Sequence, residues 1–254
     1  MSSENRFGFE WNKYNFLDEN YKLQFERWVF PFTKNDFQGK KVLDAGCGMG
    51  RNSFYALGWG VSSIIAFDYD MRSVEAAKRN LADFKNAEVF YKSIYDINWN
   101  SEFDIAISIG VIHHLKDPKL ALQNLVGSLK SGGKLLIWVY SREGNEIVVK
   151  FINPIRKLIT SKVPVKTAYF LSYFFSVPLY IFLKIFRPKN RYLNQLKNFK
   201  FWHMHSIVFD QLIPEIANYW TKKQVEELME GLCFKEFNVS CPPNGQGWTG
   251  IGIK

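Results

Sequence analysis

Short apolar runs alternate with longer stretches of helical periodicity along the middle of the chain, from Lys41 to Tyr140. This alternation is typical of strand–helix–strand units around a parallel sheet. The runs are almost continuously apolar, which suits strands that are covered on both faces. Five strands are predicted, at residues 41–45, 64–68, 88–91, 103–108 and 134–140.

Helices are predicted between these strands, where apolar residues recur three or four positions apart. Residues 71–84 and 117–130 show this spacing, and the sequence SGG ends the second of them. Another helix is predicted after Thr221, and the apolar runs at 232–239 and 248–253 can add an antiparallel pair of strands.

Two segments interrupt this plan. Residues 1–37 are dense in aromatic side chains and precede the first strand, whereas residues 141–220 separate the fifth strand from the helix after Thr221. Each segment can cap a site. The predicted organisation is therefore an aromatic N-terminal cap over 1–37, a core made of 38–140 and 221–254, and a helical lid insertion over 141–220.

Positive charge is concentrated in the insertion. The chain of 254 residues has 33 Lys and Arg against 24 Asp and Glu, and its 47% hydrophobic residues can form a real core. Residues 147–209 hold eleven basic residues and no acid, which leaves 22 basic against 24 acidic residues elsewhere. We therefore expect an anionic partner to meet the insertion. The eleven are Lys150, Arg156, Lys157, Lys162, Lys166, Lys184, Arg187, Lys189, Arg191, Lys197 and Lys200.

The cysteines Cys47, Cys233 and Cys241 are far apart and form no CxxC pair. This pattern argues against a disulfide framework, a cysteine zinc site or an iron–sulfur centre, and it favours a reducing compartment. The polar and aromatic first residues lack the basic start and apolar middle of a secretory signal. We therefore expect a cytoplasmic location and no metal site.

The strongest local signal follows the first predicted strand, which runs into DAGCGMG at 44–50. Three glycines let the backbone turn tightly and approach a ligand, and the following helix offers unpaired N–H groups to a carboxylate. Asp68, at the end of the second strand, can accept both hydroxyl groups of a ribose. The spacing is GxGxG, with Arg51 where a dinucleotide fingerprint has its third glycine, so NAD is disfavoured.

VLDAGCGMG at 42–50 and FDYD at 67–70 resemble the first and second motifs of the class I S-adenosylmethionine-dependent methyltransferases. The resemblance continues through SIYDINW at 93–99, FDIAISIGVIHHLKDP at 103–118 and LKSGGKLLIWVYS at 129–141. It implies a Rossmann-like α/β fold, with a seven-stranded, mostly parallel sheet, an antiparallel last strand and helices on both faces. It also implies S-adenosylmethionine as cofactor and S-adenosylhomocysteine as product.

The same resemblance implies which residues border each part of the cofactor. Asp68 is expected to take the ribose hydroxyls, with Tyr69 beside the adenine. Asp96 is expected to accept from the adenine amino group, with Ile94 or Tyr95 packing on the ring. The residues expected at the methionine end and in the loop after the fourth strand are Asp44, Gly46, Cys47, Gly48, Gly50 and Ile109.

Histidines supply the first candidates for a general base. A sulfonium methyl group is already activated, so the protein need only align the acceptor atom, exclude water and remove a proton where necessary. His113 and His114 follow the fourth strand, where acceptor and methyl group would meet, and imidazole titrates in a range that suits this work. The alternative is that these histidines position or pack neighbouring groups.

A second candidate cluster, WHMHSIVFDQL at 202–212, closes the basic insertion. If this element folds over the cofactor, His205 and Asp210 can form an oriented base, because a carboxylate fixes the tautomer of an imidazole. The alternative is a buried histidine and aspartate that tie the insertion to the core.

The centre of the insertion is apolar and aromatic. Residues 167–183 carry no charge, and Pro178 lies among them. A membrane span needs about 20 apolar residues, so a transmembrane helix is disfavoured and an interfacial or lid helix pair is expected. Three uses stay open: peripheral contact with an anionic membrane through 150–200, an apolar acceptor pocket, or a dimer contact.

The expected acceptor follows from these features. The insertion is compatible with nucleic acid, but SIGV at 108–111 replaces the Asp/Asn-Pro-Pro-Tyr/Phe loop of enzymes that methylate base amines, so nucleic acid is disfavoured. We expect a cytoplasmic, membrane-peripheral methyltransferase that acts on an oxygen or nitrogen of a small-molecule, apolar or lipid- or glycan-linked acceptor. The alternatives are a non-catalytic S-adenosylmethionine-binding adaptor at a membrane surface and an RNA methyltransferase.

Overall fold

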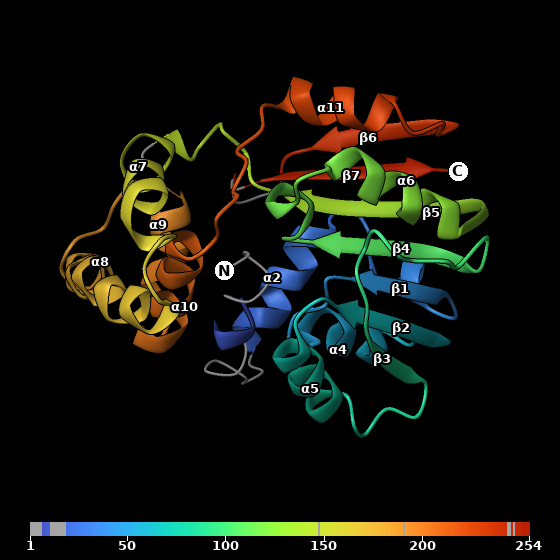
Figure 1. Cartoon of the computed structure of the whole chain (residues 1–254), viewed down its shortest axis with the longest axis horizontal. Coiled ribbons are helices and arrows are strands. Elements are labelled where there is room, and N and C mark those ends of the chain that lie inside the picture. The colour runs from blue at the N-terminus through green and yellow to red at the C-terminus, as the bar shows by residue number, and fades with distance from the viewer. Residues whose placement is uncertain (1–6, 11–18, 147, 190, 243–244, 246) are drawn as a thin grey trace.

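A seven-stranded sheet forms the centre of the computed structural model, which describes residues 7–10, 19–146, 148–189, 191–242, 245 and 247–254. The strand order is β3-β2-β1-β4-β5-β7-β6 (Figure 1). Neighbouring strands are parallel, except that β7 runs antiparallel to both β5 and β6. The predicted seven-stranded, mostly parallel sheet is confirmed. The strands are β1 (Lys41–Ala45), β2 (Ser63–Asp68), β3 (Ala87–Tyr91), β4 (Phe103–Ile109), β5 (Leu129–Val139), β6 (Glu236–Ser240) and β7 (Trp248–Ile253).

Strands β1, β2 and β4 end at the same edge of the sheet. Ala45 pairs with Phe67 of β2, and Asp44 pairs with Ile107 of β4. The strand order runs outward from β1 to β3 on one side and from β4 to β6 on the other, so the order reverses between β1 and β4. Open α/β sheets bind ligands at such a reversal, beyond the carboxyl ends of the strands.

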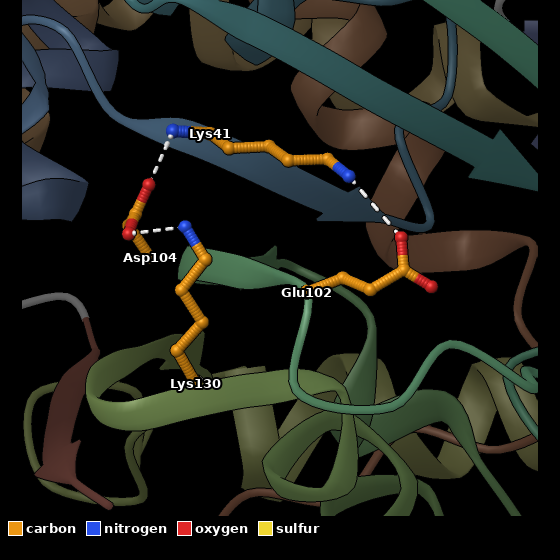
Figure 2. Close-up of polar contacts among 4 residues, drawn as sticks. All are labelled: Lys41, Glu102, Asp104 and Lys130. Carbon is orange, nitrogen blue, oxygen red and sulfur yellow. Dashed lines mark hydrogen bonds and ion pairs between the residues drawn. The ribbon is translucent and has the colours of Figure 1, made fainter.

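Charged side chains hold the opposite edge of the sheet, where the strands begin (Figure 2). The backbone N–H of Lys41 donates to Oδ2 of Asp104 at 2.8 Å, and Nζ of Lys41 lies 3.1 Å from Oε2 of Glu102. Nζ of Lys130 lies 2.9 Å from Oδ1 of Asp104. These contacts join the starts of β1, β4 and β5 and leave their carboxyl ends open to a ligand.

Helices cover both faces of the sheet (Figure 1). On one face, α6 and α11 contribute Leu122 and Met229 to the core; on the other, α2 and α4 contribute Phe25 and Ala56. Of the predicted N-terminal cap, residues 1–6 and 11–18 lie outside the described residues. The helices around the sheet are α2 (Glu19–Val29), α3 (Lys34–Phe37), α4 (Arg51–Gly58), α5 (Met71–Asn80), α6 (Pro118–Ser128) and α11 (Lys222–Glu230).

Two of the predicted helices end earlier than the sequence indicates. Helix α5 ends at Asn80, before the predicted residue 84. Helix α6 ends at Ser128 because Leu129 already pairs with Phe103 of β4, so the SGG sequence lies inside β5. Pairing with β4 therefore decides this boundary, and helical spacing along the chain cannot show it.

Residues 141–220 form a group of helices beyond the carboxyl ends of β1 and β4 (Figure 1). Helices α8 and α10 pack on each other through Tyr169 and Phe209, whose ring centroids lie 5.5 Å apart. The insertion consists of π-helical turns at Val148–Ile152 and Arg156–Thr160, α7 (Asn153–Ile155), α8 (Val165–Ile185), α9 (Arg191–Lys197) and α10 (Phe201–Leu212).

The insertion leaves and rejoins the core at one point. Ser141 and Trp220 form an isolated parallel bridge. The N–H of Arg142 donates to the carbonyl of Trp220 at 2.9 Å, and the N–H of Trp220 donates to the carbonyl of Tyr140 at 3.1 Å. The two ends of the insertion therefore lie side by side.

Helix α8 continues through Pro178 without ending. Proline leaves the carbonyl four residues earlier without its helical partner, and that residue, Phe174, lies on the exposed side of the helix. By length and composition alone α8 could cross a membrane, with 28% of its most apolar stretch buried in the protein. Its exposed face carries Phe170, Phe174, Ile181 and Ile185.

Candidate active site

A cavity of about 740 Å³ lies beyond the carboxyl ends of the strands. The loop after β1, the ends of β2 and β4, residues 7–10, α2 and α10 all contribute to its wall. The cavity therefore joins the core to both segments that the sequence predicts to cap a site.

The glycine loop after β1 is fixed by close backbone packing. The N–H groups of Gly46 and Cys47 both donate to the carbonyl of Phe67 at 2.9 Å. Gly46 has a φ of +76°, and a Cβ at this position would lie 2.4 Å from Cγ2 of Val111. Only glycine fits there, and the loop passes Gly46, Cys47 and Gly48 along the cavity wall.

Asp44 lies beneath this loop and does not itself line the cavity. Its Oδ2 accepts a hydrogen bond from Oγ of Ser53 at 2.6 Å, and its Oδ1 has no partner among the described residues. Burial raises the pKa of Asp44 to about 7, against the opposing effect of the Ser53 bond. Asp44, like Gly50, is therefore not brought to the cavity wall, where the sequence places both beside the methionine end of the cofactor.

Asp68 lies at the end of β2 and lines the cavity. Its Oδ2 accepts from the N–H of Gly48 at 2.9 Å, and its Oδ1 accepts from the N–H of Asp70 at 3.0 Å. Burial raises the pKa of Asp68 to about 6, although both hydrogen bonds lower it. A carboxylate has about four acceptor sites, so acceptor capacity remains on Asp68 for a ribose hydroxyl.

Aromatic and apolar residues follow Asp68 along the wall. The rings of Tyr69 and Tyr91 stack with centroids 5.4 Å apart and an interplanar angle of 13°. Tyr69, Ile94, Tyr95 and Ile109 all line the cavity, at the positions where the sequence places the adenine and the loop after β4. Together with the glycine loop and Asp68, these residues fit S-adenosylmethionine.

Asp96 is not brought to the cavity. It is exposed, and its N–H donates to the carbonyl of Ser93 in a turn that carries the side chain outward. Lys92 and Ser93 line the cavity instead. The expected contact of Asp96 with the adenine amino group is therefore corrected, because Asp96 lies outside the cavity lining.

The two histidines after β4 have different surroundings. His113 is fully buried, lies outside the cavity lining and packs its ring 3.9 Å from that of Tyr140, so the structure does not support it as a base. Burial also holds its pKa well below the usual range. His114 lines the cavity, and its Nδ1 lies 2.7 Å from the carbonyl of Ile216.

The tautomer of His114 follows from this contact. A carbonyl can only accept, so Nδ1 carries the proton and donates it to Ile216, and Nε2 is the unprotonated nitrogen. Burial lowers the pKa of His114 to about 4. The ring is therefore neutral near pH 7, and of the two neighbouring histidines it is the one that can accept a hydrogen bond inside the cavity.

The predicted pair of His205 and Asp210 does not form. His205 is buried against α8, with Nδ1 2.8 Å from Oγ of Ser176 and Nε2 3.4 Å from Oγ of Ser172. Residues five positions apart on a helix point about 140° from each other, so the two side chains of α10 lie on different faces. His205 joins α10 to α8, whereas Asp210 lines the cavity.

Asp210 has partners that the sequence does not indicate. The hydroxyl of Tyr140 donates to its Oδ2 at 2.6 Å, and the carboxyl of Glu10 shares a hydrogen bond with it. Arg51 lies near both carboxyl groups, with its guanidinium carbon 4.4 Å from the ring centroid of Tyr21. The only signal for Glu10 is a single acid among aromatic residues.

Nine of the eleven basic residues between positions 147 and 209 fall into two groups. Arg156 is buried and structural, because its Nη1 donates to the carbonyl of Pro214 at 2.7 Å and its guanidinium also bonds to Asn153. Eight others are exposed, and none forms an ion pair within the described part of the chain. The eight are Lys150, Lys157, Lys162, Lys166, Lys184, Arg187, Lys189 and Lys200.

Comparison with known proteins finds relatives of this chain. A family model of the methyltransferase domain matches residues 36–162. The tRNA U34 carboxymethyltransferase of Campylobacter hominis is 32% identical over 125 residues, which cover 46% of this chain and 41% of that protein. The protein of the same name from Pseudomonas paraeruginosa is 36% identical over 118 residues, or 45% of this chain and 36% of that protein. The matches thus span less than half the length of these relatives.

Solved structures show the same fold at low sequence identity. A SAM-dependent methyltransferase from Aquifex aeolicus superimposes with a TM-score of 0.53 and 14% identity over 92% of this chain and 89% of that chain. Magnesium protoporphyrin IX methyltransferase from Synechocystis, solved with bound SAH, gives a TM-score of 0.54 and 12% identity over 99% and 85%.

These relatives correct the expected partners. The curated relatives are named for tRNA, which contradicts the expectation of a small-molecule or lipid-linked acceptor with nucleic acid disfavoured. The peripheral membrane contact through 150–200 belongs to the same interpretation and is not retained. SIGV at 108–111 replaces the loop of enzymes that methylate base amines. This replacement argues against that one reaction and does not exclude methylation at other atoms of a nucleotide.

Proposed function

The chain belongs to the methyltransferase domain family, with S-adenosylmethionine as methyl donor, and from this premise we propose that it transfers the methyl group to an oxygen or nitrogen atom of tRNA. The observation that carries the proposal is the name that curated relatives share, tRNA U34 carboxymethyltransferase. These relatives match this chain over part of their length, so a tRNA acceptor is a proposal that requires an experiment.

The charge of the insertion supports a nucleic-acid acceptor. Eight exposed cations lie between residues 147 and 209, where the sequence has no acid to neutralise them. Phosphate groups bind such surfaces largely by releasing their counterions. The cavity also has aromatic walls, including Trp28, Tyr140 and Tyr219, on which an unstacked base can pack.

The residues of the cavity divide the work of methyl transfer. When bound, S-adenosylmethionine supplies a methyl group that is already activated. The glycine loop and Asp68 hold the donor, and the aromatic wall excludes water from the acceptor. Neutral His114 offers Nε2 as a hydrogen-bond acceptor that can orient an O–H or N–H group.

The test is transfer of a labelled methyl group into an extract of the source cell. The extract is separated after the reaction into tRNA, other nucleic acid, lipid and aqueous small molecules. We expect label in the tRNA fraction, and digestion to nucleosides then identifies the methylated atom. Asp68→Ala is the control, because it removes the expected ribose contact and should abolish labelling of every fraction.

Salt provides a second measurement on the same protein. If the exposed cations contact phosphates, tRNA affinity should fall steeply as salt rises, by a logarithmic slope of about 0.7 to 0.9 for each phosphate neutralised.

In the labelling experiment, label in the lipid or small-molecule fraction, with none in tRNA, would contradict the proposal.

A further inference from the structure

Four segments that are far apart in the sequence meet at one point of the cavity wall. Asp210 comes from α10, Tyr140 follows β5, Arg51 begins α4, and Glu10 lies in the helical turn at residues 7–10. All four line the cavity. Arg51 directly follows Gly50, so the group adjoins the glycine loop.

Glu10 and Asp210 share one proton between them. A hydrogen bond between two carboxyl groups requires a proton on one of them. The hydroxyl of Tyr140, which donates to Oδ2 of Asp210 at 2.6 Å, favours the ionised form of Asp210 and so places the proton on Glu10. Burial, followed by the charge of Asp210, holds the pKa of Glu10 well above its usual range. Burial also raises the pKa of Asp210, but the hydroxyl of Tyr140 and the charge of Arg51 oppose this shift. The pair therefore carries one negative charge, on Asp210.

Glu10 is also incompletely satisfied. Its side chain is 1% exposed, and its Oε2 has no hydrogen-bond partner among the described residues. A buried polar atom without a partner costs free energy unless a ligand or water satisfies it. Oε2 is an acceptor, since Glu10 uses its proton toward Asp210, so the ligand that fits offers an O–H or N–H group.

We propose that Asp210, held by Tyr140 and by the carboxyl group of Glu10, binds the reacting O–H or N–H group of the methyl acceptor and takes its proton. The inference rests on the proposed function and assigns residues to it. In the reaction the acceptor atom forms its bond to the methyl carbon, and the carbon–sulfur bond breaks with its electrons moving to sulfur. The proton of the acceptor passes to Asp210. Tyr140 is a positioning residue, because it acts through Asp210, and Glu10 positions Asp210 while its Oε2 can also accept a hydrogen bond from the ligand.

A purely structural role is the competing explanation. The same hydrogen bond could simply fasten residues 7–10 to the insertion and close the cavity. Amide variants separate the two roles. Asn at 210 and Gln at 10 can each keep a hydrogen bond across the pair, but only Asn at 210 removes the carboxylate that takes the proton.

The experiment compares Asp210→Asn with Glu10→Gln, using total incorporation of labelled methyl group from the unfractionated extract. We expect Asp210→Asn to lower kcat by about 100- to 10,000-fold and Glu10→Gln to lower it by less than about tenfold. S-adenosylhomocysteine affinity and thermal stability should stay within about twofold and a few degrees of the wild type in both variants. Asp83→Asn is the matched control. Asp83 is exposed and belongs to the domain around the sheet, so this variant should leave kcat unchanged.

A second readout does not depend on activity. The infrared difference spectrum between the wild type and Glu10→Gln at neutral pH should contain the C=O band of one buried protonated carboxyl group. The band of Asp44, whose pKa is raised to about 7, is common to both proteins and cancels. Other charged or titratable groups that line the same cavity include Arg51, His114, Tyr140, His203, Glu215 and Tyr219. Asp83→Asn should retain this band.

Three results would overturn the inference. Equal loss of kcat in the two amide variants would assign the pair to closing the cavity. Loss of S-adenosylhomocysteine binding in Asp210→Asn would assign it to the donor. A difference spectrum without this band would place the proton elsewhere. Failure of the proposed function is distinct, because it appears as wild-type label outside the tRNA fraction.

Discussion

The two halves of the cavity are built in different ways. The donor half uses backbone groups of the glycine loop and one carboxylate, Asp68, that lie within 25 positions of one another. The proposed acceptor half uses side chains, Glu10, Tyr140 and Asp210, that come from segments up to 200 positions apart. Backbone geometry tolerates little change, whereas side chains on separate helices can be replaced one at a time. The contrast predicts that substitutions in the two halves have effects of different kind and size.

The largest effect should come from Gly46→Ala. The new Cβ would lie 2.4 Å from Cγ2 of Val111, at a φ of +76°, so the loop or the wall must move. We expect binding of S-adenosylhomocysteine to weaken by about 100-fold or more, measured by calorimetric titration. Gly39→Ala is the matched control, since it has a φ of +72° and open space around it. It should lower stability without changing the affinity, and equal affinity losses in both variants would remove the steric explanation.

Asp68→Asn should have the next largest effect. The amide keeps the size of the side chain but loses the charge that strengthens hydrogen bonds from a ribose. We expect an affinity loss for S-adenosylhomocysteine of about 10- to 100-fold. Asp104→Asn, at the opposite edge of the sheet, should leave this affinity unchanged. An Asp68→Asn variant that binds S-adenosylhomocysteine with wild-type affinity would contradict the assignment of Asp68 to the donor half.

Charge reversal in the insertion should act on the acceptor alone. Replacing Lys150, Lys157, Lys162 and Lys166 by Glu should weaken tRNA binding by about tenfold or more and reduce its salt dependence. Affinity for S-adenosylhomocysteine should not change. Lys222→Glu with Lys223→Glu, on α11 of the core, is the control for unspecific charge effects. If the substitutions in the insertion and those on α11 weaken tRNA binding equally, the insertion is not the binding surface.

The smallest effect is a dependence of donor affinity on pH. Burial raises the pKa of Asp68 to about 6, and ribose hydroxyls donate to its ionised form. Affinity for S-adenosylhomocysteine should therefore rise by about fourfold between pH 5.5 and 7.5 and then level off, with proton release on binding at acid pH. Calorimetry in buffers of different ionisation enthalpy measures both quantities. In Asp68→Asn this rise should be absent, and a fall in wild-type affinity over the range would contradict the assignment.

The sequence predicts the donor half well because its signals are local. Strand β1 has the predicted bounds, and the loop that follows lies on the cavity wall with Asp68. Asp96 is the exception, since the direction of a side chain in a short turn does not follow from spacing. The acceptor half is less predictable. That Asp210 faces Tyr140 while His205 faces α8 depends on how α10 is rotated against two different neighbours, and Glu10 depends on a contact across the whole chain.

The joint between Ser141 and Trp220 makes the insertion a module. Its two ends are already held together by backbone hydrogen bonds at the end of β5, so the sheet does not rely on the intervening helices to bring β6 and β7 into place. A short linker could replace those helices at little cost in loop closure. Evolution can therefore exchange one helical unit for another at this joint while the sheet and the loop that hold the methyl donor are inherited intact.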